Sequence, residues 1–114
     1  MPTLTPLHVR RILLAGQGLA SEHPAKPGPA DVLAAIRRMH ALQIDTISVV
    51  NRSPYFVLWS RLGQYDPKWL EQLHEDGALF EYWAHAACFI PIEDYPLYVD
   101  RMRVRGLKRR EYVA

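Results

Sequence analysis

Cysteine is almost absent from the chain, since Cys88 is the only one among 114 residues. A single cysteine excludes an internal disulfide and a zinc site built from several thiolates. The five histidines show neither an HExxH pattern nor another paired spacing typical of metal ligands. We therefore expect no metal and no other cofactor, and we expect a reducing, cytoplasmic setting.

Long apolar runs are also missing. No run approaches the roughly 20 residues that span a membrane, and the first residues lack the apolar segment of a signal peptide. We expect no membrane association. Apolar residues make up 49% and charged residues 23% of the sequence, as in an ordinary globular domain. The length predicts one small domain or a piece of a larger protein.

Positive charge is scarce except at the C-terminal end. Residues 1–100 carry eight basic and eleven acidic side chains, a net charge of −3, whereas residues 101–114 have a net charge of +5. This run is either a solvated helix end or a segment that contacts phosphates, because clustered Arg and Lys supply most of the sequence-independent affinity for nucleic acid. Its basic side chains are Arg101, Arg103, Arg105, Lys108, Arg109 and Arg110.

Capping signals and apolar periodicity predict most of the regular elements. Thr5-Pro6 and Ser53-Pro54 each place an N-cap residue before a proline at the first helical position. A β-branched, alternating stretch predicts a strand over residues 43–49. The predicted helices run from Pro6 to about Ala15, Ala30 to Ala41, Ser53 to Leu62, Pro67 to Asp76, and from Ile92 onward. Leu79–Trp83 and Ala87–Ile90 predict a hairpin that turns near Ala84-His85.

From the second helix on, this is the element order of a winged helix. We predict a mixed α/β, mainly α fold: a winged helix-turn-helix with an extra N-terminal helix and a small β-hairpin wing. Residues 1–20 would hold the N-terminal helix, 30–91 the winged-helix module, and 92–114 a basic helix that leads to a missing C-terminal part. Trp59, Trp69 and Trp83 are expected to anchor the core, although Trp83 near the wing is also placed to stack on bases.

The helix that would enter the major groove of DNA is acidic. In winged-helix regulators this is the second helix of the helix-turn-helix, here about 67–76. It carries Lys68 against three acidic residues, Glu71, Glu75 and Asp76. Phosphates would repel these carboxylates, so the usual mode of base readout is disfavoured.

Gln43 and Asp45 form the clearest candidate for chemistry. In a strand, residues i and i+2 project to the same face, about 6.6 Å apart along the chain. An amide and a carboxylate that converge in this way can hold one water molecule for hydrolysis. The same pattern is also typical of a capping aspartate beside a surface glutamine. His85 is either a polar residue of the wing tip or an acid or base.

Three separated motifs resemble one known family. The segments LQIDTISVV, LWSRLGQYDP and LFEYWAHAA are similar, at compatible spacing, to the N-terminal part of the winged-helix crosslink-repair DNA glycosylases of the YcaQ/AlkX type. The resemblance runs from about Val32 to Tyr98. It implies tandem winged-helix modules and a further β domain on a polypeptide several times this length. We therefore expect this chain to be the N-terminal portion, inactive or weak alone, with possible self-association of the truncated fragment.

The resemblance also implies site residues. In that family a Gln-x-Asp motif is catalytic, with Gln-x-Gln in a related antibiotic self-resistance branch, and the matching residues are Gln43, Ile44 and Asp45. Apart from the resemblance, we expect His85 of the wing tip and the basic residues from Arg101 to Arg110 to contact DNA. The partner would be double-stranded DNA that carries alkylation damage, and no cofactor is implied.

The chemistry suits these side chains. N7-alkylation makes guanine cationic, which weakens its glycosidic bond, so no strong general acid is needed. An ionised carboxylate can stabilise an oxocarbenium-like sugar and activate water, and an amide can orient that water. We predict a monofunctional DNA glycosylase of base excision repair that acts on alkylated purines such as N7-alkylguanine, including interstrand crosslinks. The alternative is a noncatalytic winged-helix DNA-binding protein or transcriptional regulator.

Overall fold

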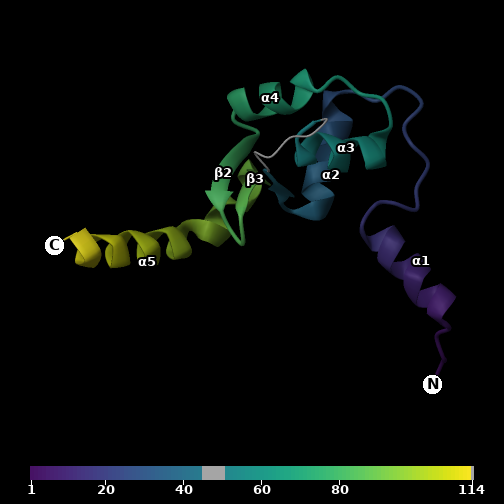
Figure 1. Cartoon of the computed structure of the whole chain (residues 1–114), viewed down its shortest axis with the longest axis horizontal. Helices are drawn as coiled ribbons and strands as arrows, with labels where there is room; N and C mark the ends of the chain where they lie inside the picture. Colours follow the sequence, from purple (N-terminus) through teal and green to yellow (C-terminus); the bar gives the residue numbers. More distant parts are fainter. Residues whose placement is uncertain (45–50, 114) are drawn as a thin grey trace.

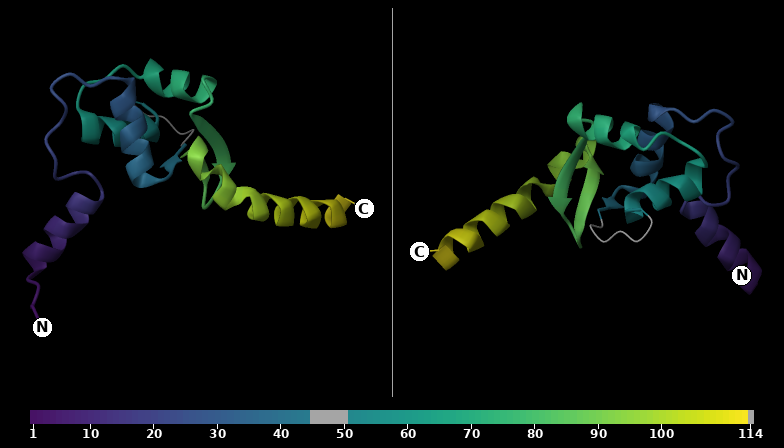
Figure 2. Two further views of the ribbon diagram at one scale, coloured as in Figure 1. Left: turned by 180° about the vertical axis from the view of Figure 1, so that it is seen from behind. Right: turned by 45° about the horizontal axis from the view of Figure 1, so that its top comes forward.

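The computed structural model describes residues 1–44 and 51–113, with side chains as far as residue 110. Residues from α2 to β3 form a body, and α1 and α5 extend from opposite ends of it (Figures 1 and 2). The overall extents are 54 × 44 × 30 Å. In chain order the elements are α1 (Pro6–Gly16), α2 (Pro29–Met39), β1 (Leu42–Gln43), α3 (Ser53–Leu62), α4 (Lys68–Glu75), β2 (Leu79–Trp83), β3 (Ala87–Pro91), the 3-10 helix η1 (Ile92–Asp94) and α5 (Tyr95–Val113).

The core of the body lies between α2, α3, α4 and one face of the sheet. On α2, Val32 and Ile36 stand one turn apart and are both fully buried, so this face of the helix packs inward. Trp69, expected to anchor the core, and Leu73 of the same helix α4 are partly buried against this cluster. The other buried members of the core are leucines of α3, α4, β1 and β2: Leu42, Leu58, Leu62, Leu70 and Leu79.

Contacts at the N-terminal ends of the helices explain where the helices begin. Thr5 Oγ1 accepts a hydrogen bond from the backbone N–H of His8 at 3.3 Å, which caps α1 as predicted. At α2, Asp31 Oδ2 accepts from the backbone N–H of Gly28 at 2.8 Å. Ser53 was expected to be the N-cap of α3, but Arg52 holds that position and Ser53 lies in the first turn. An arginine has no acceptor atom, so α3 begins without a side-chain cap.

The three strands form one antiparallel sheet in the order β1-β3-β2. Gln43 pairs with Cys88, and Cys88 pairs with Tyr82 on its other side. Because side chains alternate along a strand, Gln43, Cys88 and Tyr82 share one face of the sheet. The pair Phe80 and Ile90, two residues further along, lies on the same face. The opposite face carries Leu42 and Leu79, which pack into the core.

The face of the sheet that holds Tyr82 is covered by the start of α5. Tyr98 packs edge-on against Phe80 and Tyr82, with ring centroids 6.1 Å and 5.1 Å apart, and Tyr95 packs against Phe80 at 5.3 Å. Beyond these contacts α5 projects away from the body (Figure 1). The sheet is therefore covered by helices on both faces, although only the first turns of α5 take part.

Two arginines attach α1 to the body. Arg38 of α2 donates to the backbone oxygen of Ala15, and Arg61 of α3 donates to that of Gln17 at 3.0 Å. These carbonyls lie at the C-terminal end of α1, where the helix dipole favours cations. No residue of α1 is buried, so these contacts at its end are what place it.

The predicted fold class is confirmed: the chain is mainly helical, with a small three-stranded antiparallel sheet compatible with a winged-helix-like fold. The order helix, strand, helix, helix, strand, turn, strand is found from α2 to β3. The strand predicted over 43–49 begins at Leu42, and its pairing extends to Ile44, whose N–H donates to the oxygen of Ala87 at 2.7 Å. Residues 45–50 of that prediction lie outside the described residues.

The expectation for two of the three tryptophans was wrong. Trp59 of α3 is 57% exposed and Trp83 of β2 is 64% exposed, so neither anchors the core. Trp59 instead lines a pocket on the surface together with Tyr55 and Tyr65. Leucine, isoleucine and valine fill the core instead, and of the three tryptophans only Trp69 packs against it.

Candidate functional site

Gln43 lies at the end of the sheet where the hairpin turns. Its backbone pairs with Cys88 of β3, while its side chain is exposed. The neighbouring Leu42 is buried in the core, as the predicted alternation requires. Asp45, the second candidate catalytic residue, lies outside the described residues.

The structure brings His85 to Gln43. The Nε2 atom of His85 lies 3.2 Å from the Oε1 atom of Gln43, within hydrogen-bonding distance. His85 belongs to the turn between β2 and β3, where the N–H of Ala84 donates to the oxygen of Ala86 at 3.0 Å. The antiparallel sheet explains this proximity, because β1 lies beside β3 and ends level with the turn.

Arg105 of α5 is joined to the same hairpin. Its NH1 group donates to the backbone oxygen of Trp83, and its guanidinium carbon lies 5.3 Å from the centre of the Tyr82 ring. This distance is typical of a cation–π contact. Sequence reasoning assigned Arg105 to DNA along with the other basic residues, and no spacing signal distinguished it. Only the docking of α5 on Phe80 and Tyr82, through Tyr95 and Tyr98, reveals its contact with the hairpin.

The remaining basic residues follow α5 away from the hairpin. Arg103 makes an exposed ion pair with Asp100 at 3.7 Å, one turn earlier in the helix, and such pairs contribute little to stability. The other four are exposed and lie on an arm that projects from the body (Figure 1): Arg101, Lys108, Arg109 and Arg110. Gln43 of β1 and His85 of the turn therefore lie at the hairpin end, and the basic helix α5 extends away from them (Figure 1).

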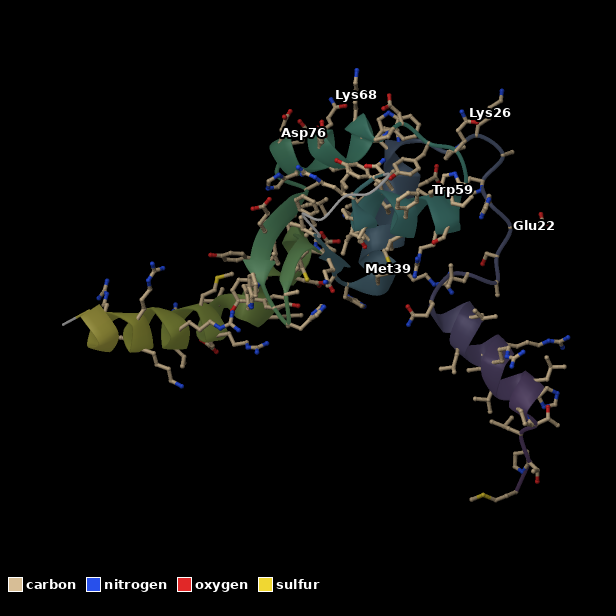
Figure 3. The ribbon with its side chains drawn as sticks, in the orientation of Figure 1. Glu22, Lys26, Met39, Trp59, Lys68 and Asp76 are labelled. Carbon is tan, nitrogen blue, oxygen red and sulfur yellow. The ribbon has the colours of Figure 1, made fainter. Side chains whose placement is uncertain are left out.

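The acidic helix α4 is on another side of the body. Lys68 and Asp76 project from it away from the body (Figure 3). Glu71 accepts a hydrogen bond from the hydroxyl of Tyr55 at 3.2 Å, and burial raises the pKa of that tyrosine, with a further contribution from Glu71. The carboxylate is thus engaged with α3, which agrees with a scaffold role for α4 and not with base readout.

Two pockets lie apart from Gln43. One, of about 220 Å³, contains Arg38 and Arg61, and burial together with the charge of Arg38 lowers the pKa of Arg61. The other, of about 120 Å³, is walled by aromatic side chains that include Tyr55 and Tyr65. The Tyr65 hydroxyl donates to the backbone oxygen of Tyr55 at 3.1 Å, and burial raises the pKa of Tyr65 to about 12.

The single cysteine is not reactive in this setting. Cys88 is fully buried between Gln43 and Tyr82 in the sheet, and burial raises the pKa of its thiol. Over residues 1–44 and 51–113, no three His, Cys, Asp or Glu residues are grouped in a way that would hold a metal ion. In the same residues, no helix has both the length and the apolar character needed to cross a membrane.

The comparison with protein families decides the assignment. The family described as DNA glycosylase AlkZ-like matches residues 36–112, more than half of the chain. The chain belongs to the AlkZ-like DNA glycosylase family. Membership supports a role in DNA repair as a DNA glycosylase, a hydrolase whose substrate is DNA. No solved structure matches the chain.

The AlkZ-like match spans the candidate site. It begins within α2, includes Gln43 and the hairpin, and ends near the end of α5. Helix α1 lies outside it. The matched region is thus the body with its basic arm, which is also the part that carries every candidate site residue of the sequence analysis. The resemblance to this family is confirmed, and the match covers residues 36–112 where the sequence motifs indicated Val32 to Tyr98.

Proposed function

We propose that this AlkZ-like protein hydrolyses the N-glycosidic bond of alkylated purines such as N7-alkylguanine, including those in interstrand crosslinks, with Gln43 and Asp45 as the catalytic residues. The single observation that carries the proposal is the placement of the Gln43 amide: exposed, on a paired strand, and in contact with His85. This contact gives the exposed amide a defined partner within the family-matched region.

The chemistry follows from the leaving group. An N7-alkylguanine is a cation, and it departs as a neutral base when the glycosidic bond breaks. The bond electrons go to the base, an oxocarbenium-like sugar forms, and water adds to its anomeric carbon. The carboxylate of Asp45 stabilises the sugar cation and takes the proton of the attacking water. The amide of Gln43 orients that water.

The basic arm supplies affinity for the duplex. Arg101, Lys108, Arg109 and Arg110 are exposed on α5, and Arg and Lys bind phosphates without regard to sequence. The rest of the chain is acidic overall, so we propose that α5 sets the side on which DNA binds. The acidic α4 would then face away from the duplex.

The experiment is base release by the full-length protein from duplex DNA with a single N7-methylguanine. A monofunctional glycosylase releases the free base and leaves an abasic site, so the strand breaks only after alkali treatment. The control is the same duplex with unmodified guanine, which keeps a neutral and far poorer leaving group. Binding of both duplexes without release of the base would instead support the noncatalytic DNA-binding alternative.

A further inference from the structure

The contact between Gln43 and His85 bears on the orientation of an amide. A glutamine side chain ends in an oxygen that accepts and an NH₂ group that donates, and a turn of 180° exchanges the two. A histidine Nε2 that carries a proton donates to the oxygen. The 3.2 Å contact joins His85 Nε2 to Oε1 of Gln43, which directs the NH₂ group away from the turn.

We propose that His85 is a positioning residue, which donates from Nε2 to Gln43 Oε1 and so holds the NH₂ group of Gln43 toward the bound nucleotide. This inference rests on the proposed function, because it assigns a purpose to the catalytic amide. An NH₂ group that donates to one lone pair of the attacking water leaves the other lone pair for the anomeric carbon. The reversed amide would offer the water an acceptor, in competition with Asp45.

Both partners of the contact stand on fixed backbone. On one side, Gln43 pairs with Cys88, and the next residue, Ile44, donates to the oxygen of Ala87 at 2.7 Å. On the other side, the short turn of His85 is closed by the bond from Ala84 to Ala86. A side-chain contact between two such fixed points restricts rotamers that an exposed glutamine would otherwise sample, at a cost in entropy that is already met before DNA binds.

Arg105 supports the same turn from α5. Its bond to the oxygen of Trp83 and its position over the Tyr82 ring hold the last residues of β2. His85 follows Trp83 by only two residues. The hairpin end is therefore contacted by α5 on one side and by β1 on the other, and these contacts restrict the position of the His85 imidazole.

The first test measures the contact itself, without activity. In the 114-residue chain, ¹⁵N NMR of the imidazole nitrogens distinguishes the two neutral tautomers of His85. We expect the proton on Nε2 and a change in the Gln43 side-chain amide signals in His85→Ala. A neutral His85 with its proton on Nδ1, or Gln43 amide signals that do not respond to His85→Ala, would overturn the proposal.

The second test compares His85→Ala with His85→Gln. The side-chain nitrogen of glutamine can replace Nε2 as a donor, whereas alanine cannot. In the full-length enzyme, we expect His85→Ala to slow single-turnover excision roughly 10-fold, as displacement of a positioned group does, with DNA affinity within about twofold of wild type. His85→Gln should recover most of the rate. His8→Ala, on the distant α1, is the matched control and should match wild type.

A double variant separates positioning from a direct DNA contact. If His85 acts only through Gln43, Gln43→Ala/His85→Ala should be no slower than Gln43→Ala, because coupled residues are not additive. Additive losses would overturn the proposal and favour a phosphate contact by His85. If Gln43→Ala lowers the excision rate but His85→Ala excises at the wild-type rate, this inference alone is overturned. A wild-type excision rate in Gln43→Ala would overturn both the inference and the proposed role of Gln43.

Discussion

The side chains of Gln43 and His85 meet across 42 residues of sequence, with 3.2 Å between Oε1 and Nε2. From the sequence these residues were expected to have different roles, one in catalysis and one in DNA binding. The sheet order β1-β3-β2 places them together, since the strand of Gln43 lies beside the strand that follows His85. The relationship joins a candidate catalytic group to the wing of the fold.

Gly63 should not tolerate a side chain. Its φ of 71° and ψ of −146° lie in a region that is essentially restricted to glycine. A Cβ atom there would also come within 2.9 Å of His23 Nδ1. We expect Gly63→Ala to lower the free energy of unfolding by about 1–3 kcal/mol, measured by urea denaturation. Gly106→Ala is the control, because Gly106 is helical and a Cβ atom added to it would meet nothing within 4 Å, and it should not destabilise.

Replacement of Tyr82 by phenylalanine should not destabilise the protein. Among the described residues the Tyr82 hydroxyl is the one buried side-chain polar group without a hydrogen-bond partner. Tyr82→Phe removes that unmet group and keeps the ring under Arg105, so the free energy of unfolding should stay equal or rise by about 1 kcal/mol. Tyr65→Phe is the comparison, since it removes a hydroxyl that donates to Tyr55 and should cost about 1 kcal/mol. Equal losses in the two variants would contradict this view of Tyr82.

The basic arm should control the salt dependence of DNA binding. Each phosphate contact that is lost reduces the slope of log affinity against log salt by about 1. We expect Lys108→Ala/Arg109→Ala to reduce the slope by about 2 for damaged and undamaged duplexes alike. Lys68→Ala changes a lysine on the outer side of α4 (Figure 3) and should leave the slope unchanged. The same slope in wild type and in the double variant would exclude α5 as the phosphate-contacting element.

Self-association should involve α1 more than the tyrosines of α5. Tyr98 of α5 packs against Phe80 and Tyr82 of the sheet and is therefore engaged within the chain. The exposed apolar side chains of α1 include Leu7, Ile12 and Leu13. We expect light scattering to show a mass that rises with concentration, and Leu13→Glu to reduce it. A constant monomer mass for wild type at high concentration would contradict this prediction.

Local signals predicted the elements well because they depend on neighbouring residues. Thr5 with Pro6 predicted the start of α1, and the helix predicted from Pro67 to Asp76 matches α4 within one residue at each end. The two short strands predicted for the hairpin, Leu79–Trp83 and Ala87–Ile90, match β2 and β3 within one residue. Leu42 inward and Gln43 outward also followed from strand periodicity alone.

Tertiary contacts account for what the sequence could not predict. The contact of His85 with Gln43 depends on β1 pairing beside β3, and the contact of Arg105 with Tyr82 depends on how α5 docks. Neither has a local signature, because no spacing rule relates residues so far apart. Trp59 and Trp83 were misjudged because size and hydrophobicity predict burial only on average.

Single-turnover release of N7-methylguanine by the Asp45→Asn variant of the full-length enzyme tests the central claim most directly. The change keeps the shape of the side chain but removes its charge and its capacity as a base, so excision should fall at least ~100-fold. DNA affinity, measured in parallel at fixed salt, should change little, and Asp76→Asn on the outer side of α4 should match wild type in both (Figure 3). A wild-type rate from Asp45→Asn, or equal losses of rate and affinity, would contradict the account.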